Sequence, residues 1–485
     1  MALTLRELEE WDDRIQVLVK EFGLNCYPQE FEICDHHEMI GYMSYSGMPA
    51  RYAHWSFGKS YEKTKTLYDY GASGLPYEMV INSNPCLAYL MRDNTDLLQI
   101  LTIAHVYGHN DFFANNFTFT SNIDAKYTLE MFKGHANRVD SYVEDPSIGL
   151  ENVERILDHA HALSFQRTRN MAIARLPEGE KRFRKWEQAQ IPEDPWREIH
   201  PKKEYVPPDL SRVPIEPEEN VLEFIAKYNP YLAGWQRDLI HIVDQEARYF
   251  IPQMETKIMN EGWASYWHYK ILKTLDLPQG LHLEFLVRHN QVLRPTPGGL
   301  NPYHLGFVIW HDIERRWNAG HTGREFTDDT PQDDLSTLHE NDTPGRKKIF
   351  EVRESDRDSS FLRRFLTEDI MRELELFQHE KRGKERVITK VSDEENWKTV
   401  KETLITNVGS QSLPVIKVVD ADFGSKRTLQ LQHSHDGRDL QLEYAEHSLR
   451  HLQALWGREV VLETEVNGKA SLLKLVDDSL KIEKP

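Results

Sequence analysis

The chain has 485 residues, of which 39% are hydrophobic and 11% aromatic, so it can bury a substantial core. Its formal net charge of −19 argues against a sequence-independent nucleic-acid binder, which needs clustered lysine and arginine. Three cysteines without a C-x-x-C pair suit a reducing compartment and exclude a thiolate metal cage. Because neither a secretion signal nor an apolar run of roughly 20 residues is found, we expect a soluble cytoplasmic protein without a membrane span.

Helical periodicity dominates residues 5–174. An aromatic, glycine-containing segment at 41–77 interrupts it, and we expect its aromatic side chains to pack in a core. Eight of the 23 prolines fall within 177–217. Residues 178–218 are therefore predicted to form an extended surface strap rather than helix or sheet.

Helical patterns resume at 220–274, where Pro252 is expected to kink or divide the helix. An acidic, solvated loop is predicted at 326–345, followed by one further helix at 361–377.

The pattern changes at about residue 386, where short alternating or β-branched segments are separated by turns. The predicted strands are ERVITKV, PVIKVVDADF, RTLQLQHS, DLQLEY, EVVLETEV and ASLLKLV, with one helix, EYAEHSLRHLQALWG, among them. The sequence therefore predicts a mainly helical body at 1–385 and a small C-terminal α/β domain at 386–485.

Two histidines four residues apart lie in the apolar run LTIAHVYGHNDFF. On a helix, His105 and His109 are one turn apart, so both imidazoles can reach one ion. Gly108 lies between them, and glycine inside a helix costs about 1 kcal/mol relative to alanine. We therefore expect another segment to approach this backbone closely.

A carboxylate in a later segment, MNEGWASYWHYK, is a candidate third ligand. Glu261 and the residues after it resemble the second active-site helix of gluzincin peptidases, in which a glutamate completes a site begun by two histidines. Two imidazoles and one carboxylate leave a coordination position for water, as catalytic zinc requires. The segment NPYHLGFVIWHDIE is similar to a helix that follows in several gluzincins, and it suggests Tyr303 as a donor to an oxyanion, with His289 and His311 as alternatives.

Several segments together resemble the stage V sporulation protein R (SpoVR) family: HWSFGKSYEKT, INSNPCLAYLM, AHVYGHNDFFANN, QMETKIMNEGWASYWHYK, NPYHLGFVIWHDIE and IFEVRESDRDSSFLRRFLTEDI. The family is named for a role in forming the spore cortex, a peptidoglycan layer. In bacteria that make no spores it is often encoded beside a PrkA-type AAA/kinase protein and a von Willebrand A-type protein. The gluzincin-like segments predict a gluzincin-like helical body, and the family's cortex role implies a peptide or peptidoglycan-precursor substrate. The family's gene neighbours imply, as the alternative, partnership with those two proteins.

Val106 stands where gluzincins carry the glutamate that activates water, and valine cannot accept a proton. Another carboxylate can fill this role, for which Glu246 and Glu38 are candidates. Alternatively, Glu261 is the base and His135 is the third ligand. In the third account the site binds a metal without hydrolysing anything, and the protein is a scaffold.

The metal prediction is therefore His105, His109 and Glu261 around one divalent ion. Zinc is favoured, although nitrogen and oxygen ligands also suit manganese or iron. Other histidines are predicted to lie on solvated, polar faces: His159, His161, His433, His435, His447 and His451, with Glu443. Two functions remain open, a zinc-dependent hydrolase of amide bonds with Glu246, His289 and Tyr303 as catalytic candidates, and a non-catalytic regulatory partner.

Overall fold

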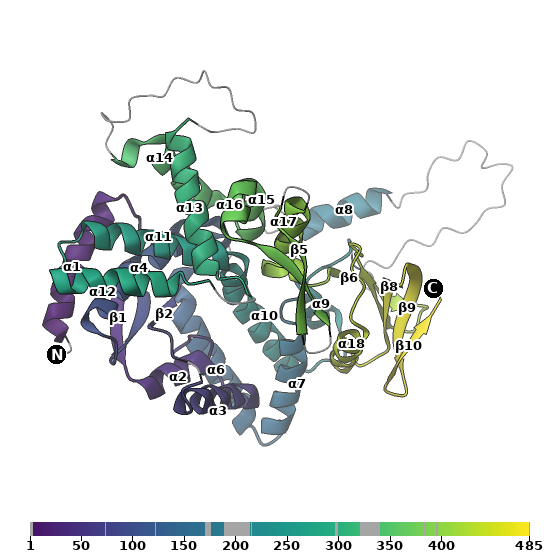
Figure 1. The fold of residues 1–485 in the computed structure, drawn as a ribbon. Coiled ribbons are helices and arrows are strands. Elements are labelled where there is room, and N and C mark those ends of the chain that lie inside the picture. The colour runs from purple at the N-terminus through teal and green to yellow at the C-terminus, as the bar shows by residue number, and fades with distance from the viewer. Residues whose placement is uncertain are drawn as a thin grey trace. The chain divides into compact units, whose positions relative to one another are not determined.

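The structure is a computed structural model that describes the chain except for residues 1–2, 73, 122, 170–175, 189–213, 215, 296–298, 321–339, 383–384, 394–395 and 485. Its contacts group the chain into two compact units. Unit 1 contains residues 1–138 and 248–412, and unit 2 contains residues 139–247 and 413–485. Figure 1 shows the elements of both units.

Unit 1 is mainly helical. Its helices are α1 (Leu5–Glu21), α2 (His36–Ser44), α3 (Trp55–Asp69), α4 (Asp96–Asn115), α5 (Phe117–Thr120), α11 (Lys257–Thr274), α12 (Gln279–Val292), α13 (Pro302–Asn318), α14 (Pro344–Ser355), α15 (Asp358–Phe365), α16 (Glu368–Glu373) and α17 (Trp397–Ile405). Short 3₁₀ helices lie at Ala125–Tyr127, Glu340–Asp342 and Gly409–Ser412. Two further helices, α6 (Thr128–Glu144) and α10 (Gly234–Glu255), contain residues of both units.

A small sheet in unit 1 has the strand order β1 (Gln29–Cys34), β3 (Cys86–Met91), β2 (Glu78–Ile81). Strands β1 and β3 are parallel, and β2 is antiparallel to β3, with Glu78 opposite Leu90. This sheet falls within 5–174, where the sequence predicts mostly helix. Strands β4 (Phe377–Arg382) and β5 (Glu385–Val391) form a separate hairpin.

The centre of unit 1 is α4, which packs against α1, α11, α12 and α14 (Figure 1). Every residue from Leu97 to Phe113 is buried, which explains why this run lacks a polar face. Neighbouring α11 also packs against α13, and Trp263, Trp267 and Trp310 are fully buried there.

Glycines set the spacing of these helices. A Cβ added at Gly108 of α4 would lie 2.6 Å from the Cα of Ala264 in α11. At the next contact, a Cβ at Gly262 would lie 2.4 Å from the backbone of Gly306 in α13. The close approach predicted at Gly108 is therefore confirmed, and α11 is its partner.

Unit 2 combines helices with a five-stranded sheet. The helices are α7 (Leu150–Leu163), α8 (Glu178–Gln188), α9 (Val221–Tyr228) and α18 (Leu442–Trp456). The strand order is β10 (Ser479–Glu483), β9 (Lys469–Val476), β8 (Val460–Val466), β7 (Thr428–His433), β6 (Ile416–Phe423), and only β7 and β8 pair in parallel. Helix α18 connects these two parallel strands and packs against α7 and β8.

The mainly helical prediction with a small C-terminal sheet is confirmed, but the grouping of residues differs from the predicted division at 385/386. The hairpin β4–β5 and α17 are grouped with unit 1, and residues 139–247 are grouped with the C-terminal sheet. Val400 and Ile405 of α17 belong to the same apolar core as α4 and α11.

Three local predictions are wrong. Residues 178–188 of the predicted strap form α8. The ion pairs Arg182–Glu178 and Arg184–Glu180 stabilise this helix, which begins after Pro177. Residues 189–213 lie outside the described part of the chain. The single helix predicted at 361–377 is two helices, since Thr367 caps α16. The DLQLEY segment is no strand, because Asp439 accepts a hydrogen bond from the Asn467 amide and α18 begins at Leu442.

Two other predicted segments are only partly tested. Helix α10 continues through Pro252 and ends at Glu255, so the division comes just after the proline. The predicted loop at 326–345 lies outside the described residues as far as 339.

Candidate metal centre

Helix α4 presents two imidazoles to one place. Its N-terminus is capped by Thr95, whose side chain accepts a hydrogen bond from the Leu98 amide. One turn separates His105 from His109, and their ring centroids are 4.7 Å apart. Both side chains are buried, with relative exposures of 3% and 6%.

Helix α11 brings a carboxylate to these rings. Its first amides, those of Ile258 and Met259, donate to the Asp358 carboxylate at 2.9 Å, which anchors the helix N-terminus. Glu261 follows within the first turns. Its Oε2 lies 3.5 Å from His109 Nε2 and 3.9 Å from His105 Nε2.

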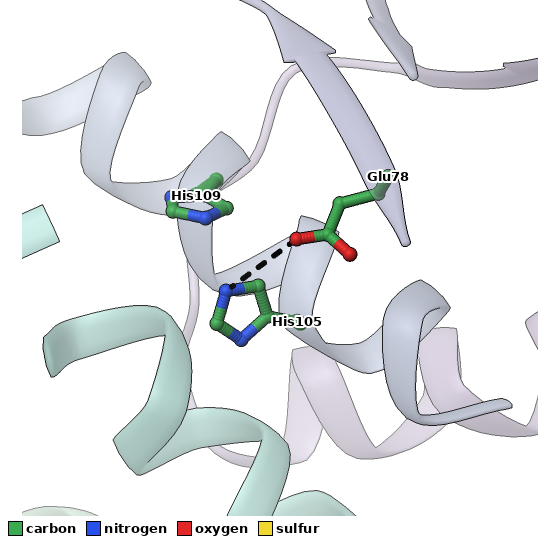
Figure 2. A group of neighbouring side chains, drawn as sticks. All are labelled: Glu78, His105 and His109. Carbon is green, nitrogen blue, oxygen red and sulfur yellow. Dashed lines mark ion pairs between the residues drawn. The ribbon is translucent and has the colours of Figure 1, made fainter. Parts of the chain in front are cut away.

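A second carboxylate approaches from strand β2. Glu78 Oε1 lies 4.0 Å from His105 Nε2 (Figure 2). Ligand atoms of Glu78, His105 and His109 all lie within 4.8 Å of one another, a separation at which they can share a metal ion. Glu78 was not among the residues predicted from the sequence. The feature that could have indicated it is an acidic residue at the start of the otherwise apolar strand EMVI.

The outer nitrogen of each imidazole has a hydrogen-bond partner. His109 Nδ1 lies 2.9 Å from Asn260 Oδ1, and His105 Nδ1 lies 2.9 Å from His268 Nδ1. These two partners were also missed, although His268 follows Glu261 by seven residues and thus shares its helix face. Metal-bound histidines in proteins characteristically have such a partner on the nitrogen that faces away from the ion.

Two of the inner atoms, in contrast, have none. His105 Nε2 and Glu261 Oε2 are buried without a hydrogen-bond partner among the described residues. Buried polar atoms are rarely left in this state unless a water or an ion satisfies them. Four ligand atoms about 2.0–2.1 Å from a tetrahedral ion would lie roughly 3.3–3.5 Å apart. The observed separations of 3.5–4.0 Å are close to this spacing, so the residues fit a small divalent cation.

Burial and mutual repulsion set the charges at this centre. Burial, assisted by the neighbouring His105, lowers the pKa of His109 to about 4, so this imidazole is neutral at neutral pH. Burial also raises the pKa of Glu78, and the nearby Glu261 charge adds to this. Burial opposes ionisation of Glu261 too, but the adjacent His105 and His109 outweigh it and lower the pKa of Glu261.

Comparison with known proteins assigns most of the chain to one family. Residues 2–413 match the family model described as SpoVR like protein, and residues 414–467 match the SpoVR-like C-terminal domain. The chain belongs to the SpoVR family. The chain is also 34% identical over 485 residues to the uncharacterized protein YcgB of Escherichia coli (strain K12), covering 95% of this chain and 92% of the relative. No solved structure matches.

The SpoVR family models meet between residues 413 and 414, next to a boundary between the two compact units. Among the described residues, no helix combines the length and apolar character that crossing a bilayer requires.

The structure brings Tyr303 of this SpoVR-family chain to the centre. Its ring centroid lies 6.1 Å from that of His105, and the Glu261 charge, together with burial, raises the pKa of its hydroxyl. His289 does not contact the ligand atoms; its Nδ1 lies 2.8 Å from His268 Nε2. His311 packs between Phe307 and Tyr266, with ring centroids 4.5 and 4.9 Å away.

The remaining candidates are Glu38, His135 and Glu246. Glu38 accepts a hydrogen bond from the Asp35 amide and completes the cap of α2. His135 is buried on α6, with its ring 6.4 Å from that of Phe132. Glu246 is buried on α10 and belongs to unit 2, whereas the histidine pair belongs to unit 1.

His447 and Glu443 of unit 2 are exposed, as expected, but the other histidines predicted to lie on solvated faces are less exposed. His159 of α7 and His451 of α18 are 2.9 Å apart between their Nδ1 atoms, so the half-buried pair joins two helices. His433 lies 2.8 Å from the Thr464 hydroxyl, and His435 pairs with Asp439. Each of these contacts has an ordinary structural role.

Proposed function

We propose that this SpoVR-family protein is a metal-dependent hydrolase of the gluzincin type, acting on an amide bond of a peptide or peptidoglycan precursor. The observation that carries the proposal is that Glu261 Oε2 of α11 lies 3.5–3.9 Å from the Nε2 atoms of His109 and His105 of α4, and that Glu261 Oε2 and His105 Nε2 are buried without a hydrogen-bond partner among the described residues. The substrate class rests on the family's name, which refers to the peptidoglycan cortex of spores.

His105 Nε2, His109 Nε2 and Glu261 Oε2 are the proposed ligands. Zinc is favoured because two neutral imidazoles and one carboxylate suit its tetrahedral preference and leave one position open. When bound, such a cation polarises a carbonyl and lowers the pKa of a coordinated water. Glu261 suits the ligand role because its lowered pKa keeps the carboxylate charged at neutral pH.

Glu78 is the proposed proton acceptor in place of the glutamate that Val106 replaces. Val106 is fully buried and has no proton-accepting group. Glu78 approaches the same imidazole from β2, and its raised pKa makes it a stronger proton acceptor than an ordinary carboxylate. The side chains of Glu78 and Glu261 retain 17% and 20% exposure, so solvent can reach the carboxylate side of the centre. Tyr303 is the proposed donor to a developing oxyanion, because its ring centroid lies 6.1 Å from that of His105.

The test is product formation by zinc-loaded protein. Muropeptides, cytoplasmic murein precursors and a panel of peptides are incubated with wild-type protein and with Glu78→Gln, and products are followed by mass spectrometry. The wild type should cleave at least one of these substrates. The Glu78→Gln variant should retain zinc but lose about 10²–10⁴-fold in rate, as expected for removal of a general base.

His159→Gln, in unit 2, is the matched control and should leave the rate unchanged. Failure of fully zinc-loaded wild type to alter any of these substrates would contradict the hydrolase proposal.

Val106 favours a second candidate, a non-catalytic regulatory partner of an AAA/kinase and von Willebrand A-type assembly. Here the buried cation would only stabilise the packing of α4 against α11. Gel filtration of the three purified proteins tests this candidate. Co-elution of wild type but not of His105→Ala, together with no hydrolysis, would support it, whereas separate elution of all three proteins would contradict it.

A further inference from the structure

Three imidazoles form a continuous hydrogen-bonded row that starts at the proposed metal centre. His105 Nδ1 on α4 lies 2.9 Å from His268 Nδ1 on α11. His268 Nε2 lies 2.8 Å from His289 Nδ1 on α12. All three residues are buried, with relative exposures of 3%, 0% and 4%. The row thus crosses three helices without depending on solvent.

Only one arrangement of protons allows a neutral row to bind a cation at its inner end. His105 must keep a lone pair on Nε2, so its proton resides on Nδ1 and is donated to His268 Nδ1. His268 must then carry its own proton on Nε2, which it donates to His289 Nδ1. Each ring fixes the tautomer of the ring before it.

The far end of the row is held by apolar packing. The His289 ring stacks on Tyr269 at a centroid distance of 4.7 Å, and Phe307 and Phe285 lie 5.2 and 5.8 Å away. Burial lowers the pKa of His289 to about 4, so this ring is neutral at neutral pH and can act as an acceptor. The aromatic contacts restrict its rotation.

We infer that His268 and His289 are positioning residues for the proposed metal centre, holding His105 in the tautomer and orientation that direct its Nε2 lone pair toward the cation. The inference rests on the proposed metal site. Asn260 does the same for His109 with a single contact, because its Oδ1 lies 2.9 Å from His109 Nδ1. The two ligands therefore have acceptors of different kinds, an amide oxygen for one and a histidine row for the other.

Two substitutions of His268 distinguish the effect of its hydrogen-bond acceptor from the effect of its side-chain volume. In His268→Asn, the amide Oδ1 takes the place of Nδ1 and can still accept from His105. In His268→Leu, no acceptor remains. Zinc affinity, measured by competition with a chromophoric chelator, should fall about 10–100-fold in the leucine variant, the usual effect of losing such a partner. The asparagine variant should stay close to wild type.

The matched control is His311→Leu, which removes a nearby imidazole that makes no hydrogen bond to the row. It should leave zinc affinity unchanged. His289→Leu retains the contact between His105 and His268, so it should weaken zinc binding less than His268→Leu does.

A second readout is the tautomer itself. Nitrogen NMR of metal-free protein labelled at histidine distinguishes a protonated from an unprotonated Nδ1. His105 should show a protonated Nδ1 in wild type and in His268→Asn, and a mixture of tautomers in His268→Leu. If the leucine variant fails to fold, the asparagine variant decides: tight zinc binding with Nδ1 protonated supports the inference, and loss of either overturns it.

Different results would contradict the metal centre and the positioning role of His268. Wild-type protein that binds no zinc would remove the metal centre itself. Tight zinc binding by both wild type and folded His268→Leu would leave the centre intact and overturn the positioning role.

Discussion

Glu78 and Glu261 flank the same imidazole, yet their pKa values shift in opposite directions. Glu261 lies beside both histidines, whose neighbourhood favours its charged form. Burial raises the pKa of Glu78, and the attraction of His105 is offset by the repulsion of Glu261. Two carboxylates with separated pKa values can take different roles, one as a charged ligand and one as a proton acceptor.

At the residue scale, buried imidazoles predict a pH dependence of stability. Burial lowers the pKa of His109, His289 and His311 to about 4, and it also lowers the pKa of His268 well below its usual value. Unfolded histidine titrates near 6.5, so between about pH 6.5 and 4 the unfolded chain binds more protons than the folded one. The free energy of unfolding of metal-free protein should therefore be greatest above about pH 6.5 and fall as the pH drops toward 4.

Urea denaturation at a series of pH values measures this dependence. His311→Leu removes one of these titrating groups and should flatten the slope. Equal stability of wild type at pH 7 and pH 5 would show that these imidazoles are not buried as described.

At the scale of elements, the centre depends on how closely α4 and α11 approach. Gly108→Ala places a Cβ 2.6 Å from the Cα of Ala264, so the two helices must separate. We expect a loss of about 1–3 kcal/mol in stability, typical of overpacking, and weaker zinc binding because the ligands lie on different helices. Thermal unfolding and zinc titration measure the two effects.

Gly58→Ala in the exposed part of α3 is the control, because a Cβ there would meet nothing within 4 Å. Alanine is favoured in helices by about 1 kcal/mol, so this variant should be at least as stable as wild type. Equal stability of Gly108→Ala and Gly58→Ala would contradict the close packing of α4 on α11.

The sequence predicted the arrangement of side chains correctly where the residues concerned lie on one helix. His105 and His109 are four residues apart, so helical geometry alone predicts that they share a face, and the structure has them 4.7 Å apart. Gly108 was informative for the same reason. Glu78 was not, because β2 has only four residues and its position beside α4 depends on pairing with β3. Propensity cannot predict a non-local contact of this kind.

The predicted helix boundaries were wrong where a side chain caps a new helix within a continuous apolar pattern. The apolar spacing at 361–377 continues through Thr367, but the Thr367 hydroxyl accepts from the Ile370 amide and starts a new helix. The histidine row was missed for a different reason. His268 and His289 lie on separate helices, so their contact follows only from the packed arrangement.

At the scale of the whole molecule, the domain boundary predicted from the sequence and the boundary between the compact units predict different stabilities for fragments of the chain. The sequence places a boundary at 385/386, whereas the compact units divide at 412/413. Val400, Ile405 and Val408 lie between these positions and belong to the core of unit 1. A fragment of residues 1–385 loses these side chains, each worth about 1.5–3 kcal/mol when fully buried.

Fragment 1–412 should therefore melt at a higher temperature than fragment 1–385, as measured by circular dichroism. Equal melting temperatures would favour the boundary predicted from the sequence, with 386–485 as the folding unit. Limited proteolysis of the full chain provides an independent check, because a stable fragment ending within α11 would contradict both divisions.

His105, His109 and Glu261 are the proposed ligands of one divalent cation. Calorimetric titration of metal-free protein with zinc tests this proposal most directly, with Glu261→Gln as the decisive variant because it keeps the shape of the side chain and removes the charge. Wild type should bind one zinc per chain, more weakly as the pH falls and the imidazoles protonate, and His159→Gln should match it. Glu261→Gln should bind far more weakly. Zinc binding by Glu261→Gln with wild-type affinity and stoichiometry would contradict the account.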